Sequence, residues 1–248
     1  MNILVCISNV PDTTSAINFS SEGTSFDSNG IQFIINPYDE FGLTKAIKLR
    51  EKHGGSVTVA HVGLVTSDPT LRKALAIGAD KVIRVDLEPK DSFSVAKELA
   101  NVIEQNSFDL IICGRESIDY NGGAVPAMLS EFLSLPFINA CTFLECTDDS
   151  VKMEREIEDG KETIESKLPL IIAGQKGLVE ESDLLIPNMR GIMTARSKPL
   201  EVCQAITNDT QTHSVNFEKP APKQDCKMIE AGNEEELINL LHHEAKVI

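Results

Sequence analysis

Residues 111–129 read IICGRESIDYNGGAVPAML, and this stretch gives the strongest indication of the fold. The apolar run that ends at Cys113 breaks at Gly114 into a loop of acidic residues and glycines. An apolar segment of helical period resumes at Val125. A short run rich in β-branched residues predicts a strand, and apolar residues three and four apart predict a helix. The loop between them lies just before a helix N-terminus, which is a position that suits an anion.

The same alternation continues on both sides of this stretch. Short apolar runs predict strands over residues 3–7, 56–63, 81–86 and 109–114. Segments of helical period predict helices over residues 39–53, 68–79, 92–106 and 124–136. Strands that alternate with helices predict a mostly parallel, doubly wound α/β sheet with helices on both faces.

Two other segments predict antiparallel pairs. FDSNGIQFIINP (26–37) has Asn29-Gly30 between two strand-like arms, so we expect a hairpin that adds an antiparallel edge. Residues 151–174 contain two alternating arms joined at Asp159-Gly160, followed by an apolar run that leads back to the sheet. These patterns predict an added β-hairpin beside the parallel strands.

The C-terminal part has a different composition. Residues 216–227 are polar and punctuated by prolines, and residues 233–248 have an acidic start followed by leucines at helical spacing. We therefore predict an α/β domain over residues 1–200, in which a nucleotide site and a plain turn at 114–125 both remain open. Residues 201–248 are predicted to form an extended arm with an amphipathic terminal helix that docks on a partner chain.

Composition argues against several classes of function. The 248 residues include 23 Lys and Arg against 38 Asp and Glu, a formal charge of −15 that disfavours a nucleic acid or an anionic membrane as partner. The six cysteines show neither CxxC nor metal-ligand spacing, and no apolar run reaches transmembrane length. The five histidines lack the pattern of a nucleophile with an orienting acid. We expect a cytoplasmic protein with reduced thiols, and the sequence gives no case for hydrolysis.

Three loops are candidates for a ligand site because ligands of open parallel sheets bind beyond the carboxyl ends of the strands. They cover residues 8–15, 35–43 and 114–125. Gly122-Gly123 would let a phosphate approach the backbone, and Arg115 could face it. A plain turn with Arg115 paired to an acidic neighbour fits the same residues, and ordinary helix capping explains 35–43. Neither GxGxxG nor GxxxxGK[ST] is present.

A fourth segment, IPNMRGIMTARSKP (186–199), mixes apolar and basic residues in an acidic chain. It would suit a docking surface, since methionine makes adaptable contacts. A loop that buries its apolar residues in the chain's own core is equally compatible with the pattern.

Taken together, the segments resemble the electron-transfer flavoprotein beta subunit family, which includes FixA-type proteins. The resemblance rests on ILVCISNVPDT, INPYDEFGLTKAIKL, RKALAIGADKVIRV, DLIICGRESIDYNGG, REIEDGKETIESKLPLIIA and IPNMRGIMTARSKPLEV, which span nearly the whole chain. The chain departs from the family at Ser8-Asn9, where members usually carry Lys and then Gln or Arg. It also departs at Met153, where Val or Ile is usual.

The resemblance implies a heterodimer in which an alpha subunit holds most of a FAD and this chain buries a structural AMP. In bifurcating members of the family a second FAD replaces the AMP, and we expect AMP here. The resemblance places near the FAD Asp12 and Thr13. It assigns to the AMP pocket Cys6, Asn36, Pro37, Tyr38, Asp39, Val62, Gly114, Arg115, Asp119, Asn121, Gly122, Gly123, Ala124 and Val125.

The resemblance also implies partners. It makes MRGIM the loop that anchors flavin dehydrogenases such as acyl-CoA dehydrogenase, with Met189 as the apolar anchor and Arg190, Arg196 and Lys198 close by. Electrons would then pass through the shared FAD to a quinone-linked oxidoreductase. The alternative is a stand-alone adenine-nucleotide-binding module or sensor of the adenine-nucleotide α-hydrolase-like type, although a phosphate loop such as SGGxDS is missing from the sequence.

Overall fold

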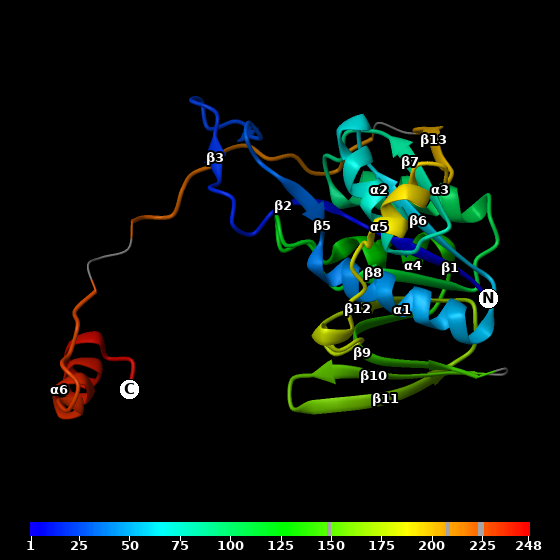
Figure 1. Cartoon of the computed structure of the whole chain (residues 1–248). Coiled ribbons are helices and arrows are strands. Elements are labelled where there is room, and N and C mark those ends of the chain that lie inside the picture. Colours follow the sequence, from blue (N-terminus) through cyan, green and yellow to red (C-terminus); the bar gives the residue numbers. More distant parts are fainter. Residues whose placement is uncertain (148–149, 207–208, 223–225) are drawn as a thin grey trace.

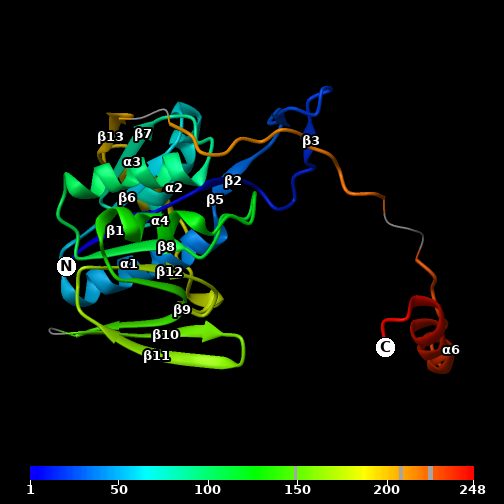
Figure 2. The ribbon, with the colours of Figure 1, turned by 180° about the vertical axis from the view of Figure 1, so that it is seen from behind.

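A mixed sheet runs through the centre of the molecule (Figures 1 and 2). The computed structural model describes residues 1–147, 150–206, 209–222 and 226–248. The parallel strands follow one another across the sheet as β9 (Phe137–Cys146), β12 (Leu170–Gly174), β8 (Leu110–Gly114), β1 (Asn2–Cys6), β6 (Ser56–Val62), β7 (Lys81–Asp86) and β13 (Leu200–Gln204). The central strands are buried on both faces, which explains why they are continuous apolar runs.

Helices cover both faces of this sheet. One apolar core lies under α1 (Pro37–His53) and α2 (Asp68–Ile77), and another lies under α3 (Ser92–Glu104) and α4 (Ala124–Leu133). The short α5 (Met189–Ala195) packs on α2. The predicted doubly wound α/β fold is confirmed.

The hairpin predicted over residues 26–37 is wrong. Its two arms form separate strands, β4 (Phe26–Asp27) and β5 (Phe33–Ile35), which pair with β3 (Asn18–Phe19) and β2 (Asn9–Pro11). Pairing β5 with β2 places Ile35 beside Asn9 and allows both Ile35 and Val10 to be fully buried. Local turn residues indicated a reversal, but burial of these side chains decided the partners.

The second predicted antiparallel pair is present. Strands β10 (Val151–Ile157) and β11 (Gly160–Ser166) form a hairpin that extends the sheet beyond β9. Gly160 has φ +154°, a value that glycine adopts readily in a turn. The chain then returns to the sheet as β12, as predicted.

The sheet extends beyond residue 200, where the domain boundary was predicted. Strand β13 pairs in parallel with β7 up to Gln204. The pairing begins at Pro199, whose carbonyl accepts the Val82 N–H. The predicted terminal helix is confirmed as α6 (Glu234–Asn239), which continues as a π-helical turn over Leu240–Ala245. Both ribbon views show it well to one side of the sheet (Figures 1 and 2). Residues 207–208 and 223–225 of the predicted arm lie outside the described residues.

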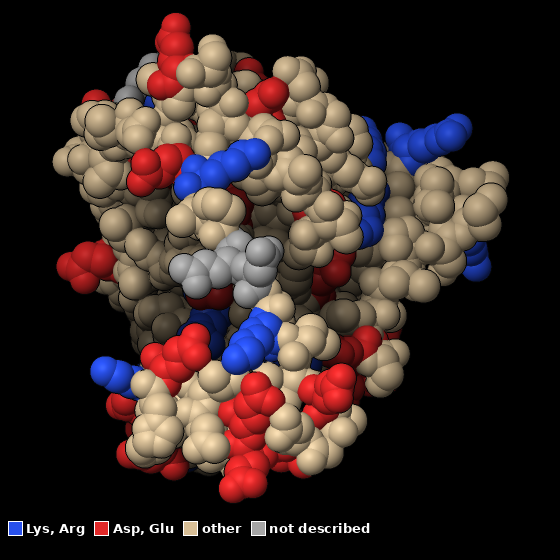
Figure 3. Space-filling view, turned by 90° about the vertical axis from the view of Figure 1, so that its left-hand side faces the viewer, with Lys and Arg blue, Asp and Glu red and all other residues tan. Residues whose placement is uncertain are grey.

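Acidic residues outnumber basic ones by 38 to 23, which gives the formal charge of −15. On the face shown in Figure 3, carboxylates gather in the lower part and basic side chains are dispersed. Within the described part of the chain, no helix combines the length and the apolar character needed to cross a membrane.

Candidate functional site

The order in which strands are added to the sheet reverses between β1 and β8. From β1 the sheet continues through β6 and β7 on one side, and through β8, β12 and β9 on the other. The loops that leave the carboxyl ends of β1 and β8 therefore diverge, which is the place where open α/β sheets bind ligands. A cavity of about 410 Å³ lies there, a volume within the range of small-molecule sites.

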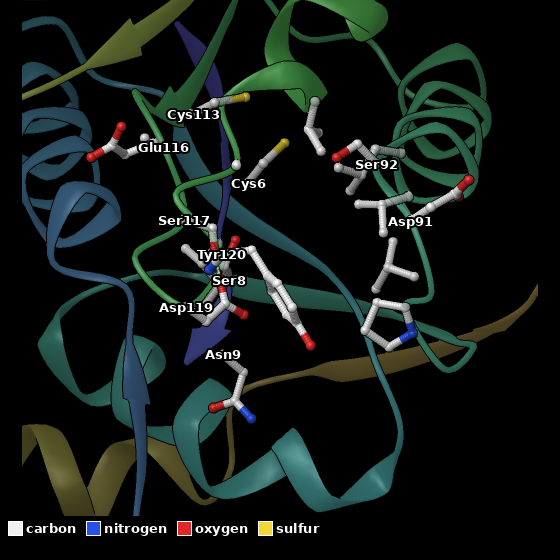
Figure 4. Close-up of a pocket in the computed structure, with 18 of the residues that line it drawn as sticks. Cys6, Ser8, Asn9, Asp91, Ser92, Cys113, Glu116, Ser117, Asp119 and Tyr120 are labelled. Atoms are coloured by element: carbon white, nitrogen blue, oxygen red, sulfur yellow. Dashed lines mark hydrogen bonds between the residues drawn. The ribbon is translucent and has the colours of Figure 1, made fainter. Parts of the chain in front are cut away.

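The floor of this cavity is largely apolar. Cys6 and Cys113, at the ends of β1 and β8, direct their sulfur atoms into it (Figure 4). The hydrogen bond to Cys6, together with burial, raises the pKa of the Cys113 thiol well above its ordinary value. Val62, Leu99 and Val125 complete the apolar lining. The floor therefore suits the face of an uncharged ring.

The loop after β8 is held in one conformation by Asn36. The Asn36 Nδ2 atom donates to the Glu116 carbonyl at 2.8 Å, and its Oδ1 atom accepts from the Ile118 N–H at 3.3 Å. Ser117 and Gly122 exchange two backbone hydrogen bonds of 2.9 and 3.1 Å, which close the loop. Asn36 thus shapes the site from behind the cavity.

Helix α4 begins at the end of this loop. Gly122, predicted to offer its N–H to a phosphate, donates it to Ser117. The N–H groups of Ala124 and Val125 lie in the first turn of α4, where intrahelical acceptors are missing, and α4 has no side-chain cap in the described structure. Their position and the helix dipole favour an anion at this end of the cavity.

Asp39 joins three elements at the back of the cavity. Its Oδ2 atom accepts from the Ser8 N–H at 2.7 Å. Burial raises the pKa of Asp39 to about 7, although hydrogen bonds from Ser8, Asn36 and Gly114 act in the opposite direction. A Cβ on Gly114 would lie 2.2 Å from Asp39 Oδ1, so only glycine permits this approach.

The predicted AMP residues divide into groups in the structure. The residues that line the cavity are Cys6, Asp39, Val62, Gly114, Asp119, Gly122 and Val125. Asn121, Gly123 and Ala124 belong to the loop and helix start beside it. Arg115 donates to Gln175 Oε1 at 2.9 Å, and its contact with the nucleotide stays a prediction. Pro37 and Tyr38 line a neighbouring cavity.

That neighbouring cavity has a volume of about 1000 Å³ and includes Asp12 and Thr13, the residues predicted near FAD. Both cavities are lined by Asn9, His61, Pro89, Asp119 and Tyr120, so the two cavities adjoin. Burial lowers the pKa of His61, whose Nδ1 lies 2.9 Å from the Ile7 carbonyl. The shared wall therefore contains a neutral imidazole.

Several lining residues were missed. Asp91 and Ser92 lie opposite Ser117 and Asp119 across the cavity (Figure 4). Their position after the strand 81–86 was a usable signal, because that strand ends at the same edge of the sheet. Residues 212–214 also line the cavity, and nothing in their local sequence indicates it.

The segment predicted to dock partners presents its apolar residues to solvent. Met189 is 77% exposed and Met193 is 71% exposed on α5. Arg196 lies in a groove between α2 and α5. Lys198 instead donates to the carbonyls of Leu75 and Ala79 at the end of α2, at 3.0 and 2.6 Å. The structure thus favours an exposed apolar surface over a loop packed into the core.

The fold and the cavity place the chain in the class of doubly wound α/β proteins with a cavity at the switch point of the sheet. Residues 24–208 match the family model described as electron transfer flavoprotein domain. The chain is 35% identical to the electron transfer flavoprotein subunit beta of Bacillus subtilis (strain 168), with 100% of both chains covered. It is 30% identical to the human protein of that name, with 82% of this chain and 80% of the relative covered. The chain belongs to the electron transfer flavoprotein subunit beta family, and the predicted resemblance is confirmed.

Proposed function

We propose that this chain is the beta subunit of a heterodimeric, cytoplasmic electron-transfer flavoprotein. In this proposal it carries electrons from flavin dehydrogenases, such as acyl-CoA dehydrogenase, to a quinone-linked oxidoreductase. The FAD shared with an alpha subunit supplies the redox chemistry. The residues of this chain bind, position and shield the cofactors, so the chain is a carrier subunit and not a catalyst by itself.

The observation that carries the proposal is the pair of adjoining cavities at the switch point. The smaller cavity combines an apolar floor with the N-terminus of α4, which matches the ring and the phosphate of AMP. Ala124 and Val125 would donate their N–H groups to the phosphate. Asn36 and Asp39 would hold the surrounding loops, so the nucleotide has a structural role.

The larger cavity supports a FAD beside this chain. Asp12 accepts hydrogen bonds from the Thr14 N–H and hydroxyl at 2.9 and 2.6 Å, and these bonds lower its pKa. Asp12 is therefore a charged, ordered group next to Thr13. Phe19, Phe26 and Phe41 provide apolar walls for a ring system.

Ligand extraction from the purified complex tests this assignment. We expect FAD and AMP in equal amounts, together with a flavin absorbance spectrum and a larger co-purifying subunit. Two FAD per complex without AMP would instead indicate a bifurcating beta subunit. ATP turnover by a colourless, unpartnered chain would favour a stand-alone nucleotide module or sensor and contradict the proposal.

A substitution on α5 tests the partner surface. Met189→Ala should slow electron transfer from the dehydrogenase while the flavin content stays unchanged, because the side chain is exposed and lines neither cavity. Ile157→Ala, at another exposed apolar residue on β10, serves as the control and should leave the rate unchanged. If Met189→Ala loses flavin and activity together, the residue has a folding role.

A further inference from the structure

The segment that follows β13 passes beside the smaller cavity, which Thr212, His213 and Ser214 help to line. We call residues 209–217 the strap. The carboxylate of the buried residue Glu98 accepts the Ile206 N–H at 2.9 and 3.1 Å, just before the strap begins. At its far end Phe217 donates its N–H to Gly23 at 2.7 Å and stacks on Phe19 with ring centroids 5.2 Å apart. The strap is thus attached at both ends.

Asp91 attaches the middle of the strap. Its Oδ2 atom accepts the N–H groups of Gln211 and Thr212 at 2.6 and 3.0 Å. Its Oδ1 atom accepts the Ser94 N–H at 2.9 Å and caps α3. One carboxylate therefore serves two elements that are distant in the sequence.

The charge of Asp91 strengthens both attachments. Burial by itself would raise the pKa of Asp91, but the hydrogen bonds from Ser94, Gln211 and Thr212 outweigh it and lower the pKa to about 2. The side chain is thus ionised at neutral pH, and bonds to an ionised acceptor are stronger than bonds between neutral groups.

These bonds place the strap at the cavity. Thr212, His213 and Ser214 line it directly after the residues that Asp91 holds. Asp91 and Ser92 lie across the cavity from Ser117 and Asp119 (Figure 4). The strap therefore forms part of the wall of the cavity.

We propose that the strap, held by Asp91, is a gate that sets the rate at which the nucleotide leaves the smaller cavity. This inference rests on the proposed function, because it assumes AMP at this site. Opening requires the bonds from Gln211 and Thr212 to break, while the attachments at Ile206 and Phe217 keep the strap close to the protein. Asp91 is a positioning residue in this scheme, since it acts through the strap.

The substitution Asp91→Asn separates the two tasks of the side chain. Its amide oxygen can still accept the Ser94 N–H, so α3 keeps its cap. Its NH₂ group faces the N–H groups of Gln211 and Thr212 and cannot accept from them. Two readouts are measured on the intact complex: amide hydrogen exchange at residues 211 and 212, and release of bound AMP into excess isotope-labelled AMP.

We expect both rates to rise by about tenfold or more, as loss of hydrogen bonds to a charged acceptor predicts. Asp109→Asn is the matched control, because Asp109 also accepts one backbone N–H, from Asn2 at 2.7 Å, but lies at the opposite end of β8. Neither rate should change in the control. If Asp91→Asn does not fold, Gln211→Pro removes one donor and leaves the helix cap intact.

Each of the remaining outcomes contradicts one part of the proposal. Unchanged exchange at residues 211 and 212 would show that Asp91 does not hold the strap. Faster exchange with unchanged AMP release would show that the strap is no gate. If the wild-type complex contains no AMP, the proposed function and the gate both fail, and the exchange data still report whether Asp91 fixes the strap.

Discussion

Replacing Asp39 by Asn should change how the stability of the protein depends on pH. An ordinary aspartate has a pKa of 3.8, whereas burial raises the pKa of Asp39 to about 7. Between these values the folded chain holds a proton that the unfolded chain has released. The folded state therefore binds more protons, and the free energy of unfolding falls as pH rises through this window.

The size of the effect follows from the two pKa values. Each pH unit inside the window lowers the free energy of unfolding by about 1.4 kcal/mol, which gives an upper limit of about 4 kcal/mol for the whole interval. Between about pH 5 and pH 7 the wild type should lose roughly 2 kcal/mol more than Asp39→Asn. The variant lacks this proton and keeps a side chain of nearly the same shape.

Urea unfolding of both proteins at several pH values in this range measures the difference directly. Groups that titrate in both proteins cancel when the two curves are subtracted. Asp109→Asn, at an exposed carboxylate, should keep the wild-type slope. Parallel curves for wild type and Asp39→Asn would refute the reasoning. That result would mean that the donors on Ser8, Asn36 and Gly114 outweigh burial and keep Asp39 ionised.

Substitutions at Gly114, Gly191 and Arg115 give three further predictions, with Gly122→Ala as the control for the first. Gly114→Ala should destabilise the protein by about 1–3 kcal/mol in thermal unfolding, because the new Cβ clashes with Asp39. Gly122→Ala should be nearly neutral, since no atom lies within 4 Å of its added Cβ. Gly191→Ala should lower the free energy of unfolding by about 1–3 kcal/mol, because its Cβ would lie 2.2 Å from a carbonyl oxygen of α2. Unchanged stability would show that α5 can shift away from α2. Arg115→Ala should leave the AMP content of the purified complex unchanged, because its guanidinium donates to Gln175 and Arg115 does not line the cavity. Loss of AMP would show that Arg115 contacts the phosphate.

Most of the fold could be predicted because its signals are local. The alternation of apolar runs and helical periods fixes the order of strands and helices, and the handedness of βαβ units limits how they are arranged. Pairing between segments that are distant in the sequence could not be predicted from such local patterns. The strands at 26–27 and 33–35 have a turn between them but pair with other segments, and the pairing of 33–35 with 9–11 buries Val10 and Ile35. Strand 200–204 was missed because three exposed and two half-buried residues give little pattern.

In the candidate site, too, local features could be predicted and contacts between distant segments could not. Cys6 and Gly114 could be grouped from sequence because carboxyl ends of neighbouring parallel strands meet at one edge. The direction of Arg115 could not, because its partner Gln175 follows a strand that enters the sheet much later in the chain. Residues 212–214 depend on a contact between Asp91 and a segment about 120 residues away. A contact between segments so far apart cannot be predicted from residue spacing.

The electrostatics of the smaller cavity favour a ligand with few negative charges. Asp39, Asp91, Glu116 and Asp119 all line it, and Lys90 is its only lysine or arginine among the described residues. Two features reduce the repulsion: burial raises the pKa of Asp39 toward neutrality, and backbone N–H groups compensate the charge of Asp91. The first turn of α4 can stabilise one phosphate, but further phosphates would extend into surroundings with an excess of carboxylates. The same chain should therefore retain AMP more strongly than ADP or ATP, and competition of the three nucleotides for release of labelled AMP would show this order.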